Sequence, residues 1–138
     1  RKRRDWVPRL AFDARTIRGM PTAGLFHTVL LRNDGRAVAC GSNGDYQCAI
    51  PELEDDVIYS QVSAGCHHTV FLRSDGRVVA CGRNGHGQCS IPEPKDGVVY
   101  VQVSAGQRHT VLLRSDGLAV ACGSNEHGQC SIPELEGG

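Results

Sequence analysis

The sequence predicts an all-β protein made of antiparallel β-propeller blades, a partial propeller of about three blades. A 41-residue unit runs through the chain three times, beginning at Ala23, Ala64 and Ala105. Its apolar segments are short and rich in strand formers, and no segment shows a helical period. A fixed repeat of this length is typical of proteins in which each unit packs against its neighbours.

The second copy shows most clearly what one repeat builds. Residues 68–73 read HTVFLR, an apolar run of strand-forming residues. Ser74, Asp75 and Gly76 follow and predict a tight turn, because Gly accepts positive φ and Asp bonds to nearby backbone. Residues 77–81, RVVAC, are a second apolar segment. The three segments together predict a β-hairpin.

The rest of the repeat predicts a loop and one further strand. Residues 82–87 are rich in Gly, and the two prolines within residues 91–94 cannot continue a hydrogen-bonded ladder. Residues 98–104, VVYVQVS, then predict a third strand. These strands are nearly continuous apolar runs, which is typical of strands covered on both faces. Stacked propeller blades explain the pattern best, and a β-solenoid is the alternative.

The chain divides into a leader and three repeats, the last of them shortened: residues 1–22, 23–63, 64–104 and 105–138. The basic leader carries a net charge of +5 and the repeats carry −5, so the repeats have no basic surface for nucleic acid. Residues 7–10 (VPRL) resemble residues 50–53 (IPEL), which indicates the degenerate end of a preceding blade. We expect either a fragment of a longer propeller or self-association through the open blade edges that completes one.

Composition and cysteine content constrain the location of the protein. No apolar run approaches the roughly 20 residues that a membrane helix needs, and no apolar segment follows the basic N-terminus as in a secretory signal. The chain has seven cysteines, six of which recur with the period of the repeat. A reduced intracellular protein, cytoplasmic or nuclear, is the favoured interpretation, and a secreted disulfide scaffold is the alternative.

Histidines recur at one position in all three copies, as His27, His68 and His109. A catalytic site needs one special residue, whereas these are three equivalents. Buried polar groups generally find hydrogen-bond partners, so we expect each imidazole to tie the start of a strand to a neighbouring backbone.

The recurring cysteines also have a structural interpretation. Cys81, His86 and Cys89 offer ligands that zinc accepts, but the first copy has Asp45 at the histidine position. Small buried hydrophobic residues are the favoured interpretation of these cysteines, with zinc binding or a Cys–Cys bridge within a repeat as the alternatives. No nucleophile elbow, P-loop, metalloprotease or dinucleotide-binding motif is present. The sequence therefore predicts no catalysis, no cofactor and no metal.

Function is expected where the three copies differ, because repeat proteins present a binding face through varied loops on a fixed scaffold. Two varied sets supply the candidate partner-binding residues: Leu25, Phe26, His67, Gln107 and Arg108 in the first, and Asp45, Tyr46, Arg83, His86, Glu126 and His127 in the second. Phe26 and Tyr46 are the strongest candidates, because exposed aromatic side chains anchor protein partners. A third varied set lies at residues 54–56, 94–96 and 135–136.

The copies share GxxHT, then DG, then GxN and GQ, from Gly24 onward. This pattern resembles the regulator of chromosome condensation family of seven-bladed β-propellers, although Cys40, Cys81 and Cys122 stand where that family often has an aromatic residue. The resemblance implies a scaffold for protein–protein interaction. It also implies two alternatives: guanine-nucleotide exchange on a small GTPase, and substrate recruitment for a HECT-type ubiquitin ligase whose catalytic segment is not among these 138 residues.

Overall fold

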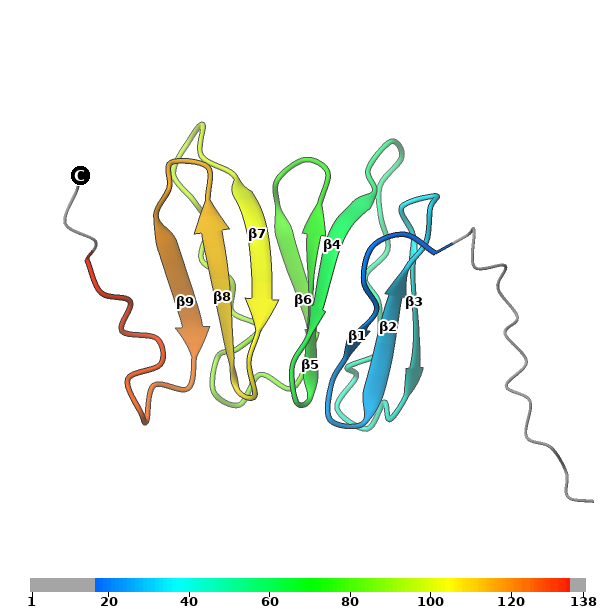
Figure 1. The fold of residues 1–138 in the computed structure, drawn as a ribbon, viewed down its shortest axis with the longest axis horizontal. Coiled ribbons are helices and arrows are strands. Elements are labelled where there is room, and N and C mark those ends of the chain that lie inside the picture. Colours follow the sequence, from blue (N-terminus) through cyan, green and yellow to red (C-terminus); the bar gives the residue numbers. More distant parts are fainter. Residues whose placement is uncertain (1–16, 135–138) are drawn as a thin grey trace, which may run out of the picture.

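The computed structural model describes residues 17–134, and this part of the chain folds into nine β-strands and contains no helix that could cross a membrane. The strands are β1 (Thr22–Ala23), β2 (His27–Leu31), β3 (Ala37–Gly41), β4 (Tyr59–Ala64), β5 (His68–Arg73), β6 (Val78–Gly82), β7 (Tyr100–Ala105), β8 (His109–Arg114) and β9 (Ala119–Gly123). They form three antiparallel sheets, which we name blade 1 (β1–β3), blade 2 (β4–β6) and blade 3 (β7–β9) (Figure 1). The predictions on residues 7–10 and 135–136 lie outside the described residues.

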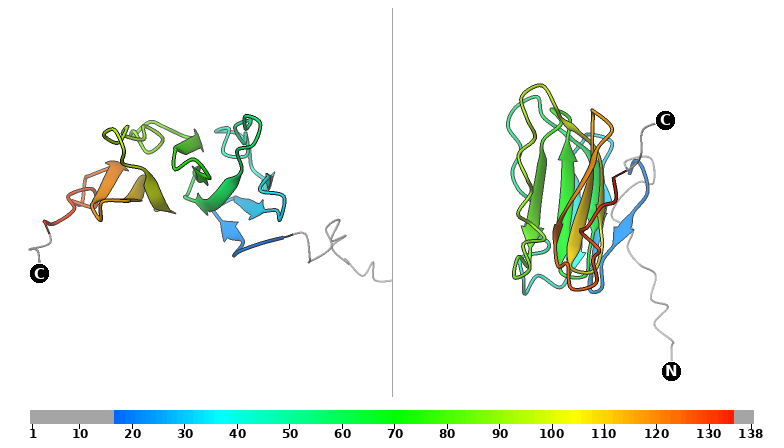
Figure 2. Two further views of the ribbon diagram at one scale, coloured as in Figure 1. Left: turned by 90° about the horizontal axis from the view of Figure 1, so that it is seen from above. Right: turned by 90° about the vertical axis from the view of Figure 1, so that its left-hand side faces the viewer.

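The three blades stand side by side in an arc, as expected for part of a propeller (Figure 2). The first strands lie close to one another, because β4 contacts both β1 and β7. Each sheet combines the closing strand of one sequence repeat with the hairpin of the next. The prediction of propeller blades is confirmed, and the separate antiparallel sheets exclude the solenoid alternative for this part of the chain.

The predicted hairpin of the second copy is formed by β5 and β6. Gly76 takes a φ of 79° at the turn, as a tight turn with positive φ requires. The carboxylate of Asp75 accepts a hydrogen bond from the backbone N–H of Arg77 at 3.2 Å and pairs with Arg73 Nη2 at 2.6 Å. The third predicted strand begins two residues later than expected, at Tyr100, and its register shifts between Tyr100 and Gln102.

Each blade has two faces, which we name after their polar residue. In β5 the side chains of His68, Val70 and Leu72 belong to the His face, and those of Thr69 and Phe71 belong to the Thr face. Alternation of side chains along a strand produces this division. Every residue of β5 is buried, because blade 3 packs on the His face and blade 1 packs on the Thr face. The prediction of strands covered on both sides is confirmed here.

Candidate protein-binding face

The first two varied sets meet at one end of the blades, the lower edge of Figure 1. The loop before the second strand of each blade is bonded there to the loop after the third strand. Ser42 N–H donates to Phe26 O at 2.8 Å, and the same bond joins Arg83 to His67 in blade 2. Gly41 permits this approach, because a Cβ at that position would lie 2.4 Å from Phe26 O. We call this end of the blades the loop face.

Varied residues touch one another across the boundary between blades 1 and 2. The rings of Phe26 and His67 lie 6.0 Å apart between their centroids. On its other side, His67 Nδ1 lies 3.5 Å from Asp45 Oδ2. Side chains that are 41 and 22 residues apart in the sequence therefore form one continuous surface.

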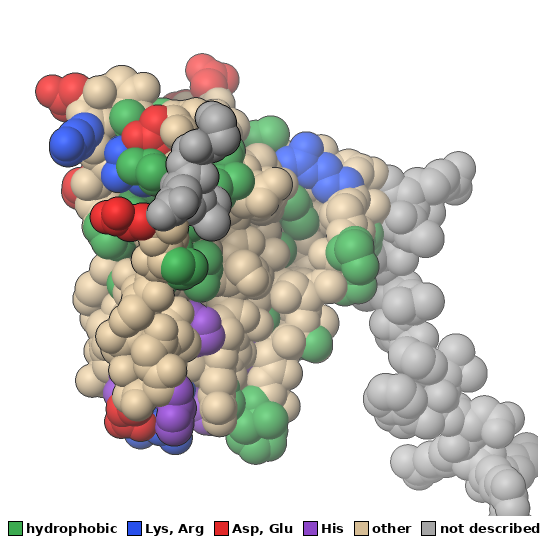
Figure 3. Space-filling model, turned by 60° about the vertical axis from the view of Figure 1, so that its left-hand side comes forward, with side chains coloured by type: hydrophobic (Ala, Val, Ile, Leu, Met, Phe, Trp, Pro, Cys, Tyr) green, Lys and Arg blue, Asp and Glu red, His purple; other side chains and the backbone are tan. Residues whose placement is uncertain are grey.

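Three apolar side chains of the loop face are exposed to solvent. Leu25 is 58% exposed, Phe26 is 61% exposed and Tyr46 is 72% exposed. Figure 3 shows hydrophobic, histidine and charged side chains together at this lower end of the molecule. Grouped apolar side chains with a polar surround are typical of interaction sites.

Tyr46 is held in a backbone conformation that disfavours a side chain. Its φ is 63°, and the equivalent residues of blades 2 and 3 are Gly87 at 80° and Gly128 at 75°. A residue other than Gly in this left-handed region costs roughly 1–2 kcal/mol. The first repeat therefore displays a tyrosine at a turn that favours glycine.

The remaining candidates lie on the same face but are spread over blades 2 and 3. They are exposed residues of the corresponding loops: Arg83, His86, Gln107, Arg108, Glu126 and His127. The loops that carry His86 and His127 are held by the amides of Gln88 and Gln129, each of which accepts a backbone hydrogen bond at 2.9 Å. The structure therefore places all the predicted binding residues at one end, with the apolar group concentrated on blade 1.

The recurring histidines join the blades beneath this face. His27 Nε2 lies 2.8 Å from Thr69 Oγ1 in the next blade, and Thr69 Oγ1 donates at 2.7 Å to Gln47 O. Because the hydroxyl proton goes to the carbonyl, the imidazole donates through Nε2. The expected bond to a neighbouring backbone is thus made through a threonine hydroxyl. The sequence did not lead us to predict that Thr69 and Gln47 join neighbouring blades, although both residues recur in every copy.

The same pair of bonds, from a histidine through a threonine hydroxyl to a glutamine carbonyl, joins blades 2 and 3, and we call it the relay. His68 Nε2 lies 3.0 Å from Thr110 Oγ1, and Thr110 Oγ1 lies 2.7 Å from Gln88 O. His68 is fully buried, and this burial lowers its pKa to about 4. Burial also lowers the pKa of His27. Each imidazole is neutral and bonded through Nε2, while its buried Nδ1 has no hydrogen-bond partner among the described residues. Buried rings of this kind support packing and are poorly placed to exchange protons with a substrate.

All seven cysteines are free thiols in the structure. Burial raises the pKa of Cys81 and Cys89 to about 11, which keeps both thiols protonated at neutral pH. Cys81 Sγ donates to Gln47 O at 3.4 Å, beside the relay. Among residues 17–134, no three His, Cys, Asp or Glu side chains are grouped to hold a metal.

The expectation that the repeat cysteines are buried is wrong for Cys40, which is exposed. Cys40 pairs with Thr28 across the sheet and so belongs to the Thr face of blade 1. No described blade packs on that face. The equivalent cysteines, Cys81 and Cys122, are half-buried because a preceding blade packs against them.

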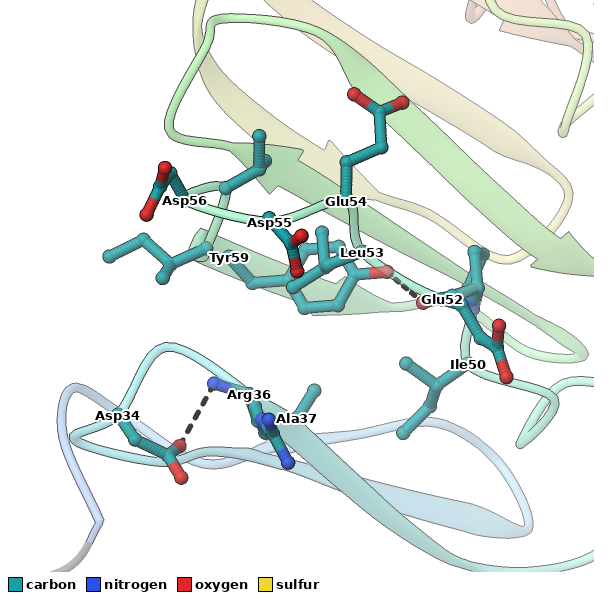
Figure 4. Close-up of a pocket in the computed structure, with 13 residues that line it drawn as sticks. Asp34, Arg36, Ala37, Ile50, Glu52, Leu53, Glu54, Asp55, Asp56 and Tyr59 are labelled. Carbon is teal, nitrogen blue, oxygen red and sulfur yellow. Dashed lines mark hydrogen bonds between the residues drawn. The ribbon is translucent and has the colours of Figure 1, made fainter.

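The third varied set lies at the opposite end of the blades. Residues 54–56 line an open groove of about 840 Å³ between blades 1 and 2 (Figure 4). Glu52, Glu54, Asp55 and Asp56 make one wall of this groove acidic. The corresponding groove between blades 2 and 3 is smaller, about 360 Å³, and carries basic as well as acidic side chains.

Antiparallel blades joined by repeated histidine–threonine bonds, with varied loops at one end, define a repeat protein of the β-propeller class. The sequence profile of the Regulator of chromosome condensation (RCC1) repeat matches residues 22–47, 59–88 and 100–129. These matches cover more than half of the chain, which belongs to this family.

Solved structures show the same fold. Yeast RCC1 (Prp20), in a complex with Kap60, aligns at a TM-score of 0.72 with 22% identity, over 89% of this chain and 33% of that one. Human WBSCR16 aligns at 0.70 with 24% identity, over 83% and 37%. The ectodomain of the Physcomitrella patens receptor kinase CR4 aligns at 0.61 with 22% identity, over 82% and 31%. The chain thus spans about a third of the length of these structures. No curated protein matches the sequence.

Replacing Tyr46 by glycine is expected to raise the free energy of unfolding by about 0.5–1 kcal/mol, because glycine accepts the left-handed backbone without strain. Asp56→Gly is the matched control, since Asp56 has a φ of 65° at the opposite end of the blade and Asp tolerates this region better than Tyr. Urea unfolding of both variants measures the difference. A loss of stability in Tyr46→Gly would show that the ring is held by packing.

Proposed function

We propose that this chain is a non-catalytic β-propeller module that binds protein partners through the loop face. The observation that carries the proposal is Tyr46, an exposed aromatic residue kept where the other repeats have glycine. Backbone strain of this kind is typical of functional positions. Phe26 and Leu25 are further exposed apolar side chains on the same loop face, and aromatic side chains are typical anchors of protein interfaces.

The chemistry of the chain supports a binding role over a catalytic one. The buried histidines of the relays are held neutral by burial, and the buried thiols are held protonated. Free thiols are typical of reducing compartments, so we place the protein inside the cell. The proposed binding at the loop face requires no proton transfer, nucleophile or cofactor from this chain.

Affinity capture with three tagged forms of the protein tests the proposal. The forms are the wild type, the double variant Phe26→Ala/Tyr46→Gly, and Leu118→Ala. Leu118 is the matched control, because it is 58% exposed but lies in the β8–β9 turn at the opposite end. We expect the double variant to lose a protein that the other two forms retain, and its affinity for that purified protein to fall at least tenfold. Equal binding by all three forms would contradict the proposal.

Family membership favours two finer roles that use the same kind of contact: guanine-nucleotide exchange on a small GTPase, and substrate recruitment for a HECT-type ubiquitin ligase. Nucleotide release from a purified GTPase separates the first role from simple binding. Faster release with the wild type than with Phe26→Ala/Tyr46→Gly would support exchange through the loop face. Unchanged release, together with retained capture, would support binding alone.

A further inference from the structure

The two end blades of the arc present different faces outward, and each of these outward faces is only partly buried. In blade 3 the burial of β8 alternates along the strand. Thr110 and Leu112 are fully buried against blade 2, whereas His109, Val111 and Leu113 are half-buried. The His face of blade 3 is therefore the less covered side, as its place at one end of the arc requires (Figure 2).

Blade 1 shows the opposite pattern. In β2, His27, Val29 and Leu31 are buried against blade 2, whereas Thr28 and Leu30 are half-buried. The Thr face of blade 1 is therefore the less covered side at the other end of the arc. The chain thus presents one partly covered His face and one partly covered Thr face.

These two faces are the same kinds of surface that pack together twice within the chain. At the boundary of blades 2 and 3, Val70 and Leu72 are buried on the His face and Leu112 is buried on the facing Thr face. Val111 and Leu113 are the equivalents on blade 3, and Leu30 is the equivalent of Leu112 on blade 1. The apolar side chains at the two ends therefore match in type and position.

The polar groups also match. His109 and the carbonyl of Gln129 occupy the places that His68 and Gln88 occupy in the relay between blades 2 and 3. Within residues 17–134, no threonine of a following blade reaches His109. Thr28 has the relay position on blade 1 and supplies the hydroxyl that such a bond needs.

The backbone at this end of the arc also has room for a neighbour. A Cβ at Gly65 would lie 2.5 Å from Gly106 O of the following blade, as well as against the ring of His68. The three atoms nearest to a Cβ at Gly106 all belong to the ring of His109, and no backbone atom of another blade is among them. The Ser63 hydroxyl accepts from Ala105 N–H at 2.9 Å, and Ser104 is its equivalent on blade 3.

We infer that the His face of blade 3 binds the Thr face of blade 1 of a second copy of this chain, head to tail. Val111 and Leu113 pack on Leu30 of the second copy, and Thr28 of that copy bonds His109 and Gln129 O as Thr110 bonds His68 and Gln88 O. Because the two faces differ, the contact is heterologous, and it extends into a ring or an open chain of copies.

Two charged variants of the 138-residue chain test this contact. Val111→Glu blocks the His face of blade 3, and Leu30→Glu blocks the Thr face of blade 1. We expect the wild type to form assemblies larger than a dimer as its concentration rises from about 1 to 100 µM. Each variant alone is expected to be monomeric. An equal mixture of the two is expected to form a dimer only, because one intact face of each kind remains. Native mass spectrometry and sedimentation velocity distinguish these species.

A milder variant covers the case in which a glutamate prevents folding. Thr28→Val keeps the shape of the side chain but removes the hydroxyl, which leaves His109 and Gln129 O without a partner in the contact. We expect its association constant to fall about tenfold or more, with a circular dichroism spectrum like that of the wild type. A monomeric wild type at 100 µM, or assembly of Val111→Glu and Leu30→Glu as strong as in the wild type, would overturn the inference.

Discussion

Replacing Gly65 by alanine is expected to lower the free energy of unfolding by about 3 kcal/mol or more. The added Cβ would lie 2.2 Å from His68 Cε1 and 2.5 Å from Gly106 O, far inside van der Waals contact. Neither neighbour has room to move, because the His68 ring is fully buried and Gly106 O is backbone of the next blade. Overpacking a dense interior costs about 1–3 kcal/mol, and here it also displaces the His68–Thr110 bond.

The matched control for this substitution is Gly85→Ala in the loop face of the same blade. Nothing lies within 4 Å of a Cβ at Gly85, and the third repeat has Glu126 at this position. Its unfolding free energy should stay within about 0.5 kcal/mol of the wild type. Urea unfolding followed by circular dichroism measures both. Equal stability of Gly65→Ala and Gly85→Ala would show that the blade boundary relaxes around a methyl group.

The fold was largely predictable because strand and turn signals are local. Residues 68–73 were predicted as a strand and form β5 with the same bounds. The hairpin turn at Gly76 was predictable from its composition alone. The start of β7 was placed two residues early, because Val98 and Val99 have strand-forming side chains but precede the ladder.

The candidate site was predictable only in part. Comparison of the repeats identified Phe26 and Tyr46 as candidates. It did not predict that their loops lie at the same end of the blades, or that residues 54–56 lie at the opposite end. That arrangement depends on the direction of each strand in its sheet. The relay partners of His27 were not predictable either, because Thr69 and Gln47 lie 42 and 20 residues away in the sequence and meet only when two blades pack.

One signal for the strain at Tyr46 was present in the sequence. Tyr46 stands where the other copies have Gly87 and Gly128, and glycine recurring in a loop indicates positive φ. The error at Cys40 has a different cause. Equivalent positions in a repeat share an environment only when both neighbouring blades are present, and no described blade packs on the Thr face of blade 1.

Acidification is expected to destabilise the fold between pH 6.5 and about 4. Burial lowers the pKa of His68 from 6.5 to about 4, so protons bind the unfolded chain more readily than the folded one in this range. The stability from neutral His68 is complete above pH 6.5 and is lost as the pH falls toward 4. One such group changes the free energy of unfolding by about 1.4 kcal/mol per pH unit, which gives a loss of about 2–3 kcal/mol between pH 7 and pH 4.5. The lowered pKa of His27 acts in the same direction.

His68→Gln separates this effect from the protonation of carboxylates. The glutamine amide keeps a donor for Thr110 Oγ1 but does not titrate, so the variant is expected to be less stable at pH 7 and to lose less stability on acidification. Burial acts to raise the pKa of Asp75, but its bonds to Arg73 and Arg77 outweigh this effect and lower that pKa, so Asp75 titrates below this range. Urea unfolding at pH 7.0 and pH 4.5 measures both proteins, and the loss in the variant should be smaller by about 2 kcal/mol. Equal losses in the two proteins would mean that the His68 ring accepts a proton without leaving the blade boundary.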